Sequence, residues 1–465
     1  MANRTAKEWE ALLYKNETVA DTMPDQLAAA QEFCEGYKLF LDRAKTEREA
    51  AAYSEELLTE AGYKPFVAGM ALKPGDKVYR IEHKKCVVAA TIGTKPLEQG
   101  FHLGIAHIDA PRLDLRPVPL YEDKDFGYFR THYYGGVRKY QWVAIPLALH
   151  GTVCRADGSC VDINIGETPG DPVFCITDLL PHLAAKQNEK KLPEGITGEN
   201  LNVLIASTPI EDKEMADRVK LNVLAILNEA YGITERDFTR AEIEVVPAFT
   251  ARDVGLDRAM IGAYGHDDRV DAYPALMAEI RTEHPAYTTV CVLTDKEEVG
   301  SDGVTGMNGE YAYAFLKELC AAFGADPIAA FRASRCLSAD VTAAYDPSFA
   351  EAFEPNNGTY AGRGIAIYKY TGSRGKSSTN DAPAELVSYL TRLLDKNSVA
   401  WQIGEMGKID LGGGGTIAKY VANRGIDTID IGVPVLSMHS PFEVVSKADV
   451  YMAYLAFKSF CEDAE

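Results

Sequence analysis

The sequence predicts an α/β protein whose main sheet is mostly parallel, with a second, β-rich domain inserted into it. Two observations lead to this fold class. From about residue 244 onward, short runs rich in β-branched residues alternate with helical segments, which indicates a parallel sheet covered by helices on both faces. Between residues 113 and 245 the pattern changes to closely spaced short strands and glycine turns, which is typical of hairpins.

The first part of the chain is expected to be helical and then to form strands. Apolar residues recur at helical spacing around Trp9 and again around Phe40, and Gly62 ends this stretch. Three runs rich in β-branched residues follow, at 78–81, 86–92 and 102–108. The last of these predicted strands carries His107 at its carboxyl end.

The insertion and the second half of the chain supply the remaining elements. In the insertion, strands are expected at 143–147, 151–153 and 161–165, and the polar stretch 187–202 is interpreted as an exposed excursion. Further strands are expected at 245–248, 288–293, 336–339 and 428–431, with helices at 272–281, 309–322, 383–397 and 447–461. The chain therefore divides into an α/β domain formed by residues 1–112 and 246–465 and a β-rich domain at 113–245.

Composition excludes several classes of protein. The chain has 68 acidic and 48 basic side chains among 465 residues, a net charge of -20, which argues against nucleic acid or an anionic membrane as the main partner. No apolar run reaches the roughly 18 residues of a membrane span, and the N-terminus lacks the apolar core of a signal peptide. Nine cysteines without a CxxC pair argue against a disulfide framework or a thiolate zinc site. We therefore expect a cytoplasmic protein.

Polar residues at the predicted strand ends are the candidates for chemistry, because open α/β sheets bind ligands beyond the carboxyl ends of their strands. Five segments qualify: 107–109, 265–269, 295–300, 338–340 and 437–440. Taken singly, an acidic pair such as Glu297 and Glu298 is more often a solvated surface feature. Together, two histidines and several carboxylates without thiolates are what a hydrolytic site with two metal ions needs.

The same segments carry a resemblance to a known family. The runs AHIDAPRLDL at 106–115, DKEEVGS at 295–301, LSAD at 337–340 and MHS at 438–440 resemble, in the same order, those of the aspartyl aminopeptidase and aminopeptidase I family. The resemblance spans nearly the whole chain. It implies a zinc-peptidase-like, three-layer catalytic domain interrupted by a β-rich oligomerisation domain. It also implies two divalent ions per subunit, Zn²⁺ first, with Co²⁺ or Mn²⁺ as alternatives.

Carried over residue by residue, the resemblance implies a role for each candidate. Five residues would hold the ions. His107 and Asp340 would bind one ion, Glu298 and His439 would bind the other, and Asp267 would bridge both. Asp268 would be the bridge if the register were shifted by one residue. Asp109 would orient the His107 imidazole, and Glu297 would be the general base that deprotonates a water between the ions.

The substrate pocket is where the chain departs from the family. Two histidines that the family usually has after the metal aspartate are missing from the run 341–347, where Asp346 also adds a negative charge. The family's basic residue for an acidic substrate side chain would fall near Lys369. The family also has an insertion histidine that enters a neighbouring subunit's active site, and His150 is the closest match, with an ordinary strand histidine as the alternative. The glycines at 412–415 would form either a backbone surface for substrate or a close packing contact.

We therefore predict a metal-dependent aminopeptidase that removes N-terminal residues from peptides, with a weak lean towards Asp and Glu. The partners expected are peptides with a free N-terminus and further copies of the chain in a large homo-oligomer such as a dodecamer, and neither nucleic acid nor membrane. Two alternatives stay open. One is a two-metal deacylase or carboxypeptidase on the same core, and the other is a non-catalytic assembly or binding homologue.

Overall fold

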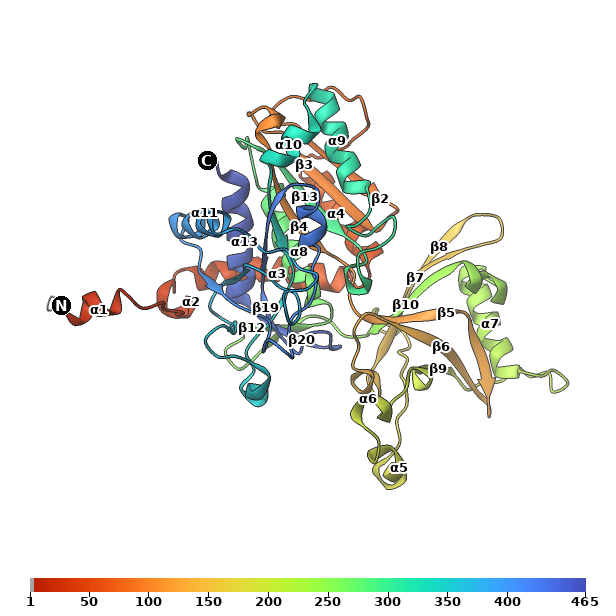
Figure 1. The fold of residues 1–465 in the computed structure, drawn as a ribbon. Helices are drawn as coiled ribbons and strands as arrows, with labels where there is room; N and C mark the ends of the chain where they lie inside the picture. The colour runs from red at the N-terminus through yellow and green to blue at the C-terminus, as the bar shows by residue number, and fades with distance from the viewer. Residues whose placement is uncertain (1–3) are drawn as a thin grey trace.

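The computed structural model describes residues 4–465, which form two lobes joined at one edge (Figure 1). The larger lobe is built on a nine-stranded sheet with helices on both faces, and the smaller lobe is built on a six-stranded sheet. The short helices α1 (Ala6–Glu10) and α2 (Val19–Thr22) extend from the larger lobe on the side away from the smaller one.

The nine-stranded sheet has the order β1-β2-β3-β13-β4-β14-β18-β16-β17. Its central strands β13, β4, β14 and β18 are parallel to one another. Every residue of β4 and β13 is buried, as expected for strands with helices over both faces. The strands are β1 (Lys64–Pro65), β2 (Lys77–Glu82), β3 (Cys86–Thr91), β4 (Phe101–His107), β13 (Thr288–Thr294), β14 (Arg335–Ala339), β16 (Ile365–Tyr368), β17 (Trp401–Ile403) and β18 (Asp427–Gly432).

Two layers of helices enclose this sheet, and each layer has its own apolar core. One layer consists of α3 (Gln26–Arg43), α4 (Glu47–Glu60), α8 (His266–Ile280), α11 (Ala384–Lys396) and α13 (Lys447–Glu462). The other consists of α9 (Tyr311–Phe323), α10 (Pro327–Ala333) and α12 (Ala418–Ala422). Alternate residues of the strands face the two layers, so that Val87 packs with the first and Val88 with the second. The predicted α/β class and the three-layer arrangement are confirmed.

A small five-stranded sheet lies beside the carboxyl ends of the central strands and has the order β11-β12-β20-β19-β15. It joins segments that are far apart in the chain: β12, near residue 260, pairs with β20, near residue 445. Its strands are β11 (Arg252–Val254), β12 (Met260–Ala263), β15 (Thr342–Ala343), β19 (Pro434–Leu436) and β20 (Glu443–Ser446). The segments that follow β12 and β19 supply two of the candidate site residues.

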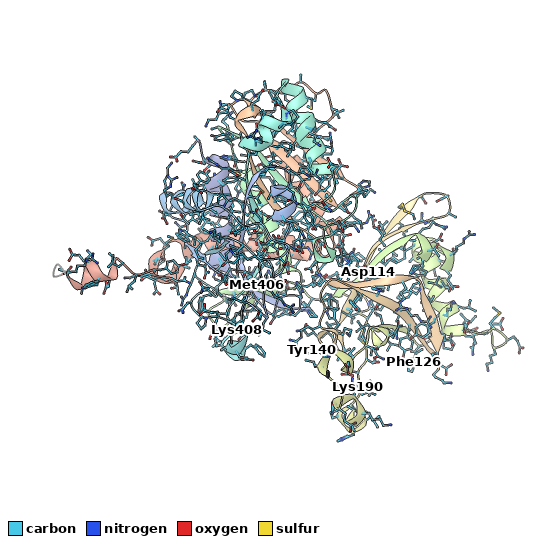
Figure 2. The ribbon with its side chains drawn as sticks, viewed as in Figure 1. Asp114, Phe126, Tyr140, Lys190, Met406 and Lys408 are labelled. Atoms are coloured by element: carbon cyan, nitrogen blue, oxygen red, sulfur yellow. A yellow bond between two sulfur atoms is a disulfide. The ribbon has the colours of Figure 1, made fainter. Side chains whose placement is uncertain are left out.

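The smaller lobe is an antiparallel sheet of order β8-β7-β10-β5-β6-β9 with a separate apolar core. Its strands are β5 (Arg112–Asp123), β6 (Phe126–Tyr134), β7 (Leu147–Cys154), β8 (Cys160–Ile165), β9 (Asn202–Ala206) and β10 (Ala241–Pro247). The excursion before β9 holds the short helices α5 (Ala185–Asn188) and α6 (Leu192–Gly195). In Figure 2, Asp114 lies near the junction of the lobes, whereas Phe126 and Lys190 lie on the outer part of the smaller lobe.

Two features of the smaller lobe differ from the sequence-based expectation. The strand expected at 245–248 in the main sheet is the end of β10 and pairs with β7 and β5 of the smaller sheet. It resembles a main-sheet strand because its last five residues are all buried in the centre of the smaller sheet. The helix α7 (Arg218–Tyr231) was not expected, and it packs Val219, Val223 and Leu227 towards the sheet.

One disulfide also departs from expectation. Cys154 and Cys160 lie opposite each other in the β7–β8 hairpin and are bonded, whereas the other seven cysteines are free. The cysteine pattern argues against a disulfide framework, and this single bond is not a framework, but the sequence did not indicate it. A cross-strand pair depends on hairpin register, and the cysteine spacing alone does not reveal that register.

Candidate active site

Three neighbouring parallel strands end at the same edge of the main sheet, and each leads into a candidate site residue. Strand β4 ends at His107, β13 leads to the turn that contains Glu297 and Glu298, and β14 leads to Asp340. Thr294 of β13 is directly opposite His107, and β14 pairs with the other side of β4. Parallel strands in this order bring these side chains together at one end of the sheet.

The five-stranded sheet brings the remaining residues to the same place. Asp267 follows β12 at the start of α8, and His439 lies in the loop between β19 and β20. Asp267 lies between the two histidines: its Oδ1 is 3.2 Å from Nε2 of His107 and its Oδ2 is 3.1 Å from Nε2 of His439. Each carboxylate oxygen therefore faces a different imidazole.

The surroundings of both histidines leave Nε2 free to bind a cation. Nδ1 of His107 donates towards Asp109, 3.2 Å from the carboxylate Oδ1 and 3.0 Å from the backbone carbonyl. Nδ1 of His439 donates to the carbonyl of Gly136 at 3.0 Å. Because these acceptors hold the proton on Nδ1, the lone pair of each ring lies on Nε2, which points towards Asp267.

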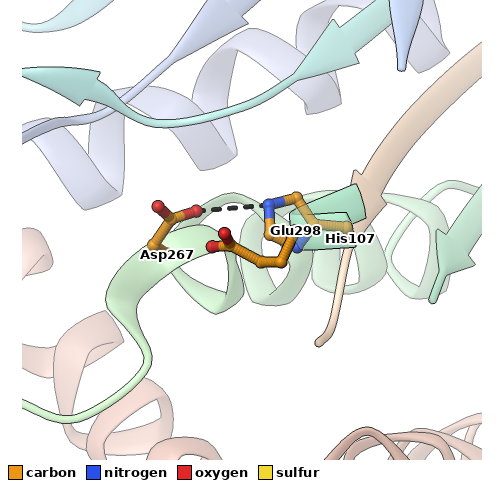
Figure 3. A group of neighbouring side chains, drawn as sticks. All are labelled: His107, Asp267 and Glu298. Atoms are coloured by element: carbon orange, nitrogen blue, oxygen red, sulfur yellow. Dashed lines mark ion pairs between the residues drawn. The ribbon is translucent and has the colours of Figure 1, made fainter. Parts of the chain in front are cut away.

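The donor set fits divalent metal ions. His107 Nε2, Asp267 Oδ1 and Glu298 Oε1 are buried without a hydrogen-bond partner, and one ligand atom from each of these residues lies within 4.8 Å of the others (Figure 3). A second such group combines His107, Glu297 and Asp340. Buried ligand atoms without partners are costly unless a cation satisfies them, and nitrogen and carboxylate oxygen are suitable zinc ligands. Glu297 belongs to this second group, so its carboxylate faces the same space.

Asp268 has a different environment from Asp267. Its Oδ2 accepts the backbone N–H of His107 at 3.1 Å, and burial with the nearby Asp271 carboxylate raises the pKa of Asp268 well above its ordinary value. Asp268 therefore supports the strand end, and the geometry favours Asp267 over Asp268 as the residue between the two histidines.

Burial and crowding of carboxylates change the acid–base properties of the site. Burial raises the pKa of Glu297 to about 7 and raises the pKa values of Glu298 and Asp340 well above their ordinary range. Burial alone would lower the pKa of His439, but Asp267 and Glu298 raise it to about 11. Several carboxylates are thus buried close together, and keeping all of them ionised is unfavourable without a cation. A bound dication would neutralise part of this negative charge.

A cavity of about 470 Å³ opens beside these residues. Its walls include the glycines Gly413, Gly414 and Gly415, together with Ser378, Met406, Thr416, Lys419, Tyr420 and Met438. Met406 belongs to a loop of the larger lobe that is labelled in Figure 2. A space of this size beside the carboxylates can hold the first residues of a peptide.

Two residues assigned to substrate from the sequence lie elsewhere. Lys369 follows β16, is exposed and does not line the cavity; Lys419 is the lysine that does. His150 is only 1 % exposed and lies between Glu49 (2.8 Å) and Glu167 (3.4 Å) of its own chain, so it offers no free side chain to a neighbouring subunit. A strand histidine was the alternative for His150, and its position in β7 agrees with that alternative.

Three residues near the site were missed from the sequence: Tyr134, Glu443 and Lys419. Tyr134 Oη donates to Asp109 Oδ2 at 2.8 Å, and Glu443 accepts the backbone N–H groups of Asp267 and His439. Lys419 follows the run of glycines at 412–415, and that run was the sequence signal near it. Contacts made through backbone N–H groups or across domains leave no spacing pattern to detect.

Known proteins of one family match nearly the whole chain. The model of the aminopeptidase I zinc metalloprotease (M18) family matches residues 40–461. A probable M18 family aminopeptidase 1 of Borrelia garinii is 46 % identical over 93 % of this chain and 96 % of its own length. The crystal structure of an M18 aminopeptidase from Thermotoga maritima has a TM-score of 0.93 at 42 % identity and covers 97 % of this chain and 100 % of that one.

A more distant structure shares the fold. The mApe1 dodecamer of S. cerevisiae has a TM-score of 0.76 at 20 % identity, covering 94 % of this chain and 97 % of that one. Within residues 4–465, no helix combines the length and apolar character that crossing a membrane requires. With the family model matching most of the sequence and close relatives matching along nearly their full length, the chain belongs to the M18 family of aminopeptidase I zinc metalloproteases.

Proposed function

We propose that this M18 aminopeptidase cleaves the first peptide bond of its substrates at a site for two divalent ions. His107 and Asp340 would hold one ion, Glu298 and His439 the other, and Asp267 would bridge them. The position of Asp267, with one oxygen near each histidine Nε2, is the observation that carries the proposal. Zinc in such a site supplies a Lewis acid that polarises a carbonyl and lowers the pKa of water towards about 7.

Glu297 is proposed as the group that moves the proton. Its carboxylate faces the ligand cluster, and burial raises its pKa to about 7, close to the value that suits a group that accepts and then returns a proton. The backbone N–H of Glu297 donates to Asp109 at 3.2 Å, which fixes the turn. Glu297 would take a proton from the attacking water and give it to the leaving amine. The carboxylates around it would favour the positively charged N-terminus of a substrate.

The test is the variant Glu297→Gln, which keeps the shape of the side chain and removes the base. We expect hydrolysis of free peptides to fall by about 10²- to 10⁴-fold, the usual contribution of a general base. Mass spectrometry of the metal content should still find two ions per chain. Glu310→Gln, at an exposed glutamate of the same lobe, is the matched control. Full activity of Glu297→Gln, or cleavage of N-acetylated peptides by the native enzyme, would contradict the mechanism.

For the substrate, we propose a preference for acidic N-terminal residues that depends on Lys419. In the described part of the chain, Lys419 is the only Lys or Arg that lines the cavity, and its Nζ lies 4.7 Å from the Tyr420 ring centroid. An ammonium group next to a partly enclosed pocket pairs well with a substrate carboxylate. This assigns to Lys419 the role that the sequence suggested for Lys369.

The variant pair Lys419→Met and Lys369→Met separates these assignments. Replacing Lys419 should lower kcat/KM for peptides that begin with Asp or Glu by about tenfold or more, the loss expected for one charge-assisted bond, and should spare peptides that begin with Ala. Replacing the exposed Lys369 should change neither. An unchanged ratio of acidic to neutral activity in Lys419→Met would rule out this preference.

We also propose that the enzyme works as a large homo-oligomer. The S. cerevisiae relative named above is a dodecamer, and the excursion of the smaller lobe exposes Leu179, Leu180 and Leu183. Exposed apolar residues gathered in one segment favour burial between subunits. Mass photometry of the purified protein tests this, and a stable, active monomer would contradict it.

A cytoplasmic location is proposed on the cysteines. Seven of the nine cysteines are free and six of these are buried, as expected in a reducing compartment, and the single bond between Cys154 and Cys160 does not form a disulfide framework. Fractionation of the source cells with detection of the enzyme tests the location, and recovery outside the cytoplasm would overturn it.

A further inference from the structure

The smaller lobe touches the active site of its own chain through the end of β6 and the turn that follows. Tyr134 is the last residue of β6, and its hydroxyl donates to Asp109 Oδ2 at 2.8 Å. Two residues later, the carbonyl of Gly136 accepts from Nδ1 of His439. Gly136 suits this close approach, because a Cβ there would lie 2.9 Å from that nitrogen.

Asp109 connects Tyr134 to the catalytic groups. Its Oδ1 accepts hydrogen bonds from Nδ1 of His107 and from the backbone N–H of Glu297, both at 3.2 Å. Its Oδ2 accepts hydrogen bonds from the backbone N–H of Glu298 at 3.2 Å and from the Tyr134 hydroxyl at 2.8 Å. Asp109 is fully buried, so no solvent can replace a lost donor. The tyrosine supplies the shortest of these four contacts.

The ring of Tyr134 is held independently of its hydroxyl. The guanidinium of Arg112 lies 3.9 Å from the ring centroid, and Arg112 is itself paired with Glu47 at 3.2 Å and Glu244 at 3.1 Å. Stacking of this kind fixes the plane of the ring and directs its hydroxyl. Removal of the hydroxyl alone therefore leaves the junction between the lobes packed.

We propose that Tyr134 is a positioning residue for catalysis, through which the inserted lobe forms part of the active site of its own chain. By holding Asp109, Tyr134 sets the orientation of the His107 imidazole and the place of the turn that carries Glu297 and Glu298. The inference rests on the proposed function, because it takes these groups as ligands and base. It assigns the insertion a role in metal binding that is separate from any role in assembly.

Tyr134→Phe is the test, with Tyr133→Phe as the matched control on the same strand. Tyr133 is 43 % exposed, and its loss of a hydroxyl should have no effect. Tyr134→Phe should weaken zinc affinity about tenfold or more, as measured by competition with a chromophoric chelator, because partners of metal ligands typically contribute 10- to 100-fold. At saturating zinc, kcat should fall while KM stays within about twofold.

A second variant reaches the site through the other contact. Gly136→Ala places a methyl group against His439 without touching Asp109 and should also weaken zinc binding. Thermal unfolding and near-ultraviolet circular dichroism check that each variant is folded. If Tyr134→Phe matches Tyr133→Phe in zinc affinity and kcat, the inference is overturned. That result is distinct from failure of the proposed function, in which the native enzyme itself would bind no metal or tolerate loss of Glu297.

Discussion

At the scale of single residues, the proposed metal ligands are held by partners that the ligand motifs do not include. Glu443 is the clearest example, because one buried carboxylate serves two ligand segments. Its Oε2 accepts the backbone N–H of Asp267 at 3.1 Å, and its Oε1 accepts that of His439 at 2.6 Å. Glu443 is 1 % exposed, so both bonds are protected from water. It thereby fixes the spacing between Asp267, the proposed bridge, and His439.

We expect Glu443→Gln to lose the second ion. One end of the glutamine is an amide donor that would face a backbone N–H, so one of the two bonds would become a repulsion. Metal content should fall from two ions per chain towards one, and activity by about tenfold or more. The control is Glu279→Gln, another buried glutamate, which bonds Tyr63 and Thr91 away from the site. Two ions retained in Glu443→Gln would show that this contact is dispensable.

Residues such as His107, Glu298 and Asp340 could be identified from the sequence because each lies at or just after the end of a strand, in a short motif. It could not name Glu443 or Tyr134, since their contacts depend on the fold rather than on spacing. The position of Lys369 away from the cavity has a local cause. Tyr368 is the last residue of β16 and is buried, and the chain then leaves the sheet, so the next side chain is exposed. The lysine that faces the cavity comes from another segment, about 50 residues later.

At the scale of elements, long amphipathic helices and buried strands were predictable from periodicity. The helix expected at 447–461 is α13, Lys447–Glu462, and the strand expected at 288–293 is β13, Thr288–Thr294. For strands that are buried inside the smaller lobe, the apolar pattern did not predict the sheet to which they belong. Strand β10 is buried because it is central in its own sheet, and its apolar run could not reveal which sheet it joins.

The docking of α4 against the smaller lobe should depend on pH. His150 in β7 lies between Glu49 of α4 and Glu167, and Lys45 also faces Glu167 at 3.6 Å. Burial alone would lower the pKa of His150, but its hydrogen bonds to Glu167 and Glu49 outweigh burial and raise it. A histidine whose pKa rises on folding contributes its full stabilisation at pH values below its ordinary pKa, near 6.5. That stabilisation is lost as the pH rises through the higher, folded value.

His150→Gln should therefore destabilise the protein more at pH 6 than at pH 9. The difference should be about 1.4 kcal/mol for each unit by which folding raises the pKa. Glu167 stays ionised over this range because its own pKa is lowered, burial being outweighed by His150 and Lys45. Urea unfolding at both pH values measures the effect, with the exposed His182→Gln as control. An equal loss at both pH values would mean that the charge of His150 does not matter.

At the scale of the whole molecule, the two lobes have separate apolar cores, and all the proposed metal ligands belong to the larger one. Metal should therefore stabilise the lobes unequally. Removal of zinc with EDTA should abolish activity and lower the unfolding temperature of the larger lobe. Zinc at a hundredfold excess over Kd should restore roughly 2.7 kcal/mol per site. Differential scanning calorimetry measures this, and equal shifts of all transitions would contradict the separation.

The pairing of β12 with β20 has a consequence for biosynthesis. These strands, together with the loops that carry Asp267 and His439, are made about 180 residues apart, and the insertion has already separated both from His107. A growing chain on the ribosome therefore lacks part of the proposed ligand set until His439 has been made. The full set of proposed ligands is expected to bind metal only in chains synthesised past His439, so that metal content should distinguish finished chains from those terminated earlier.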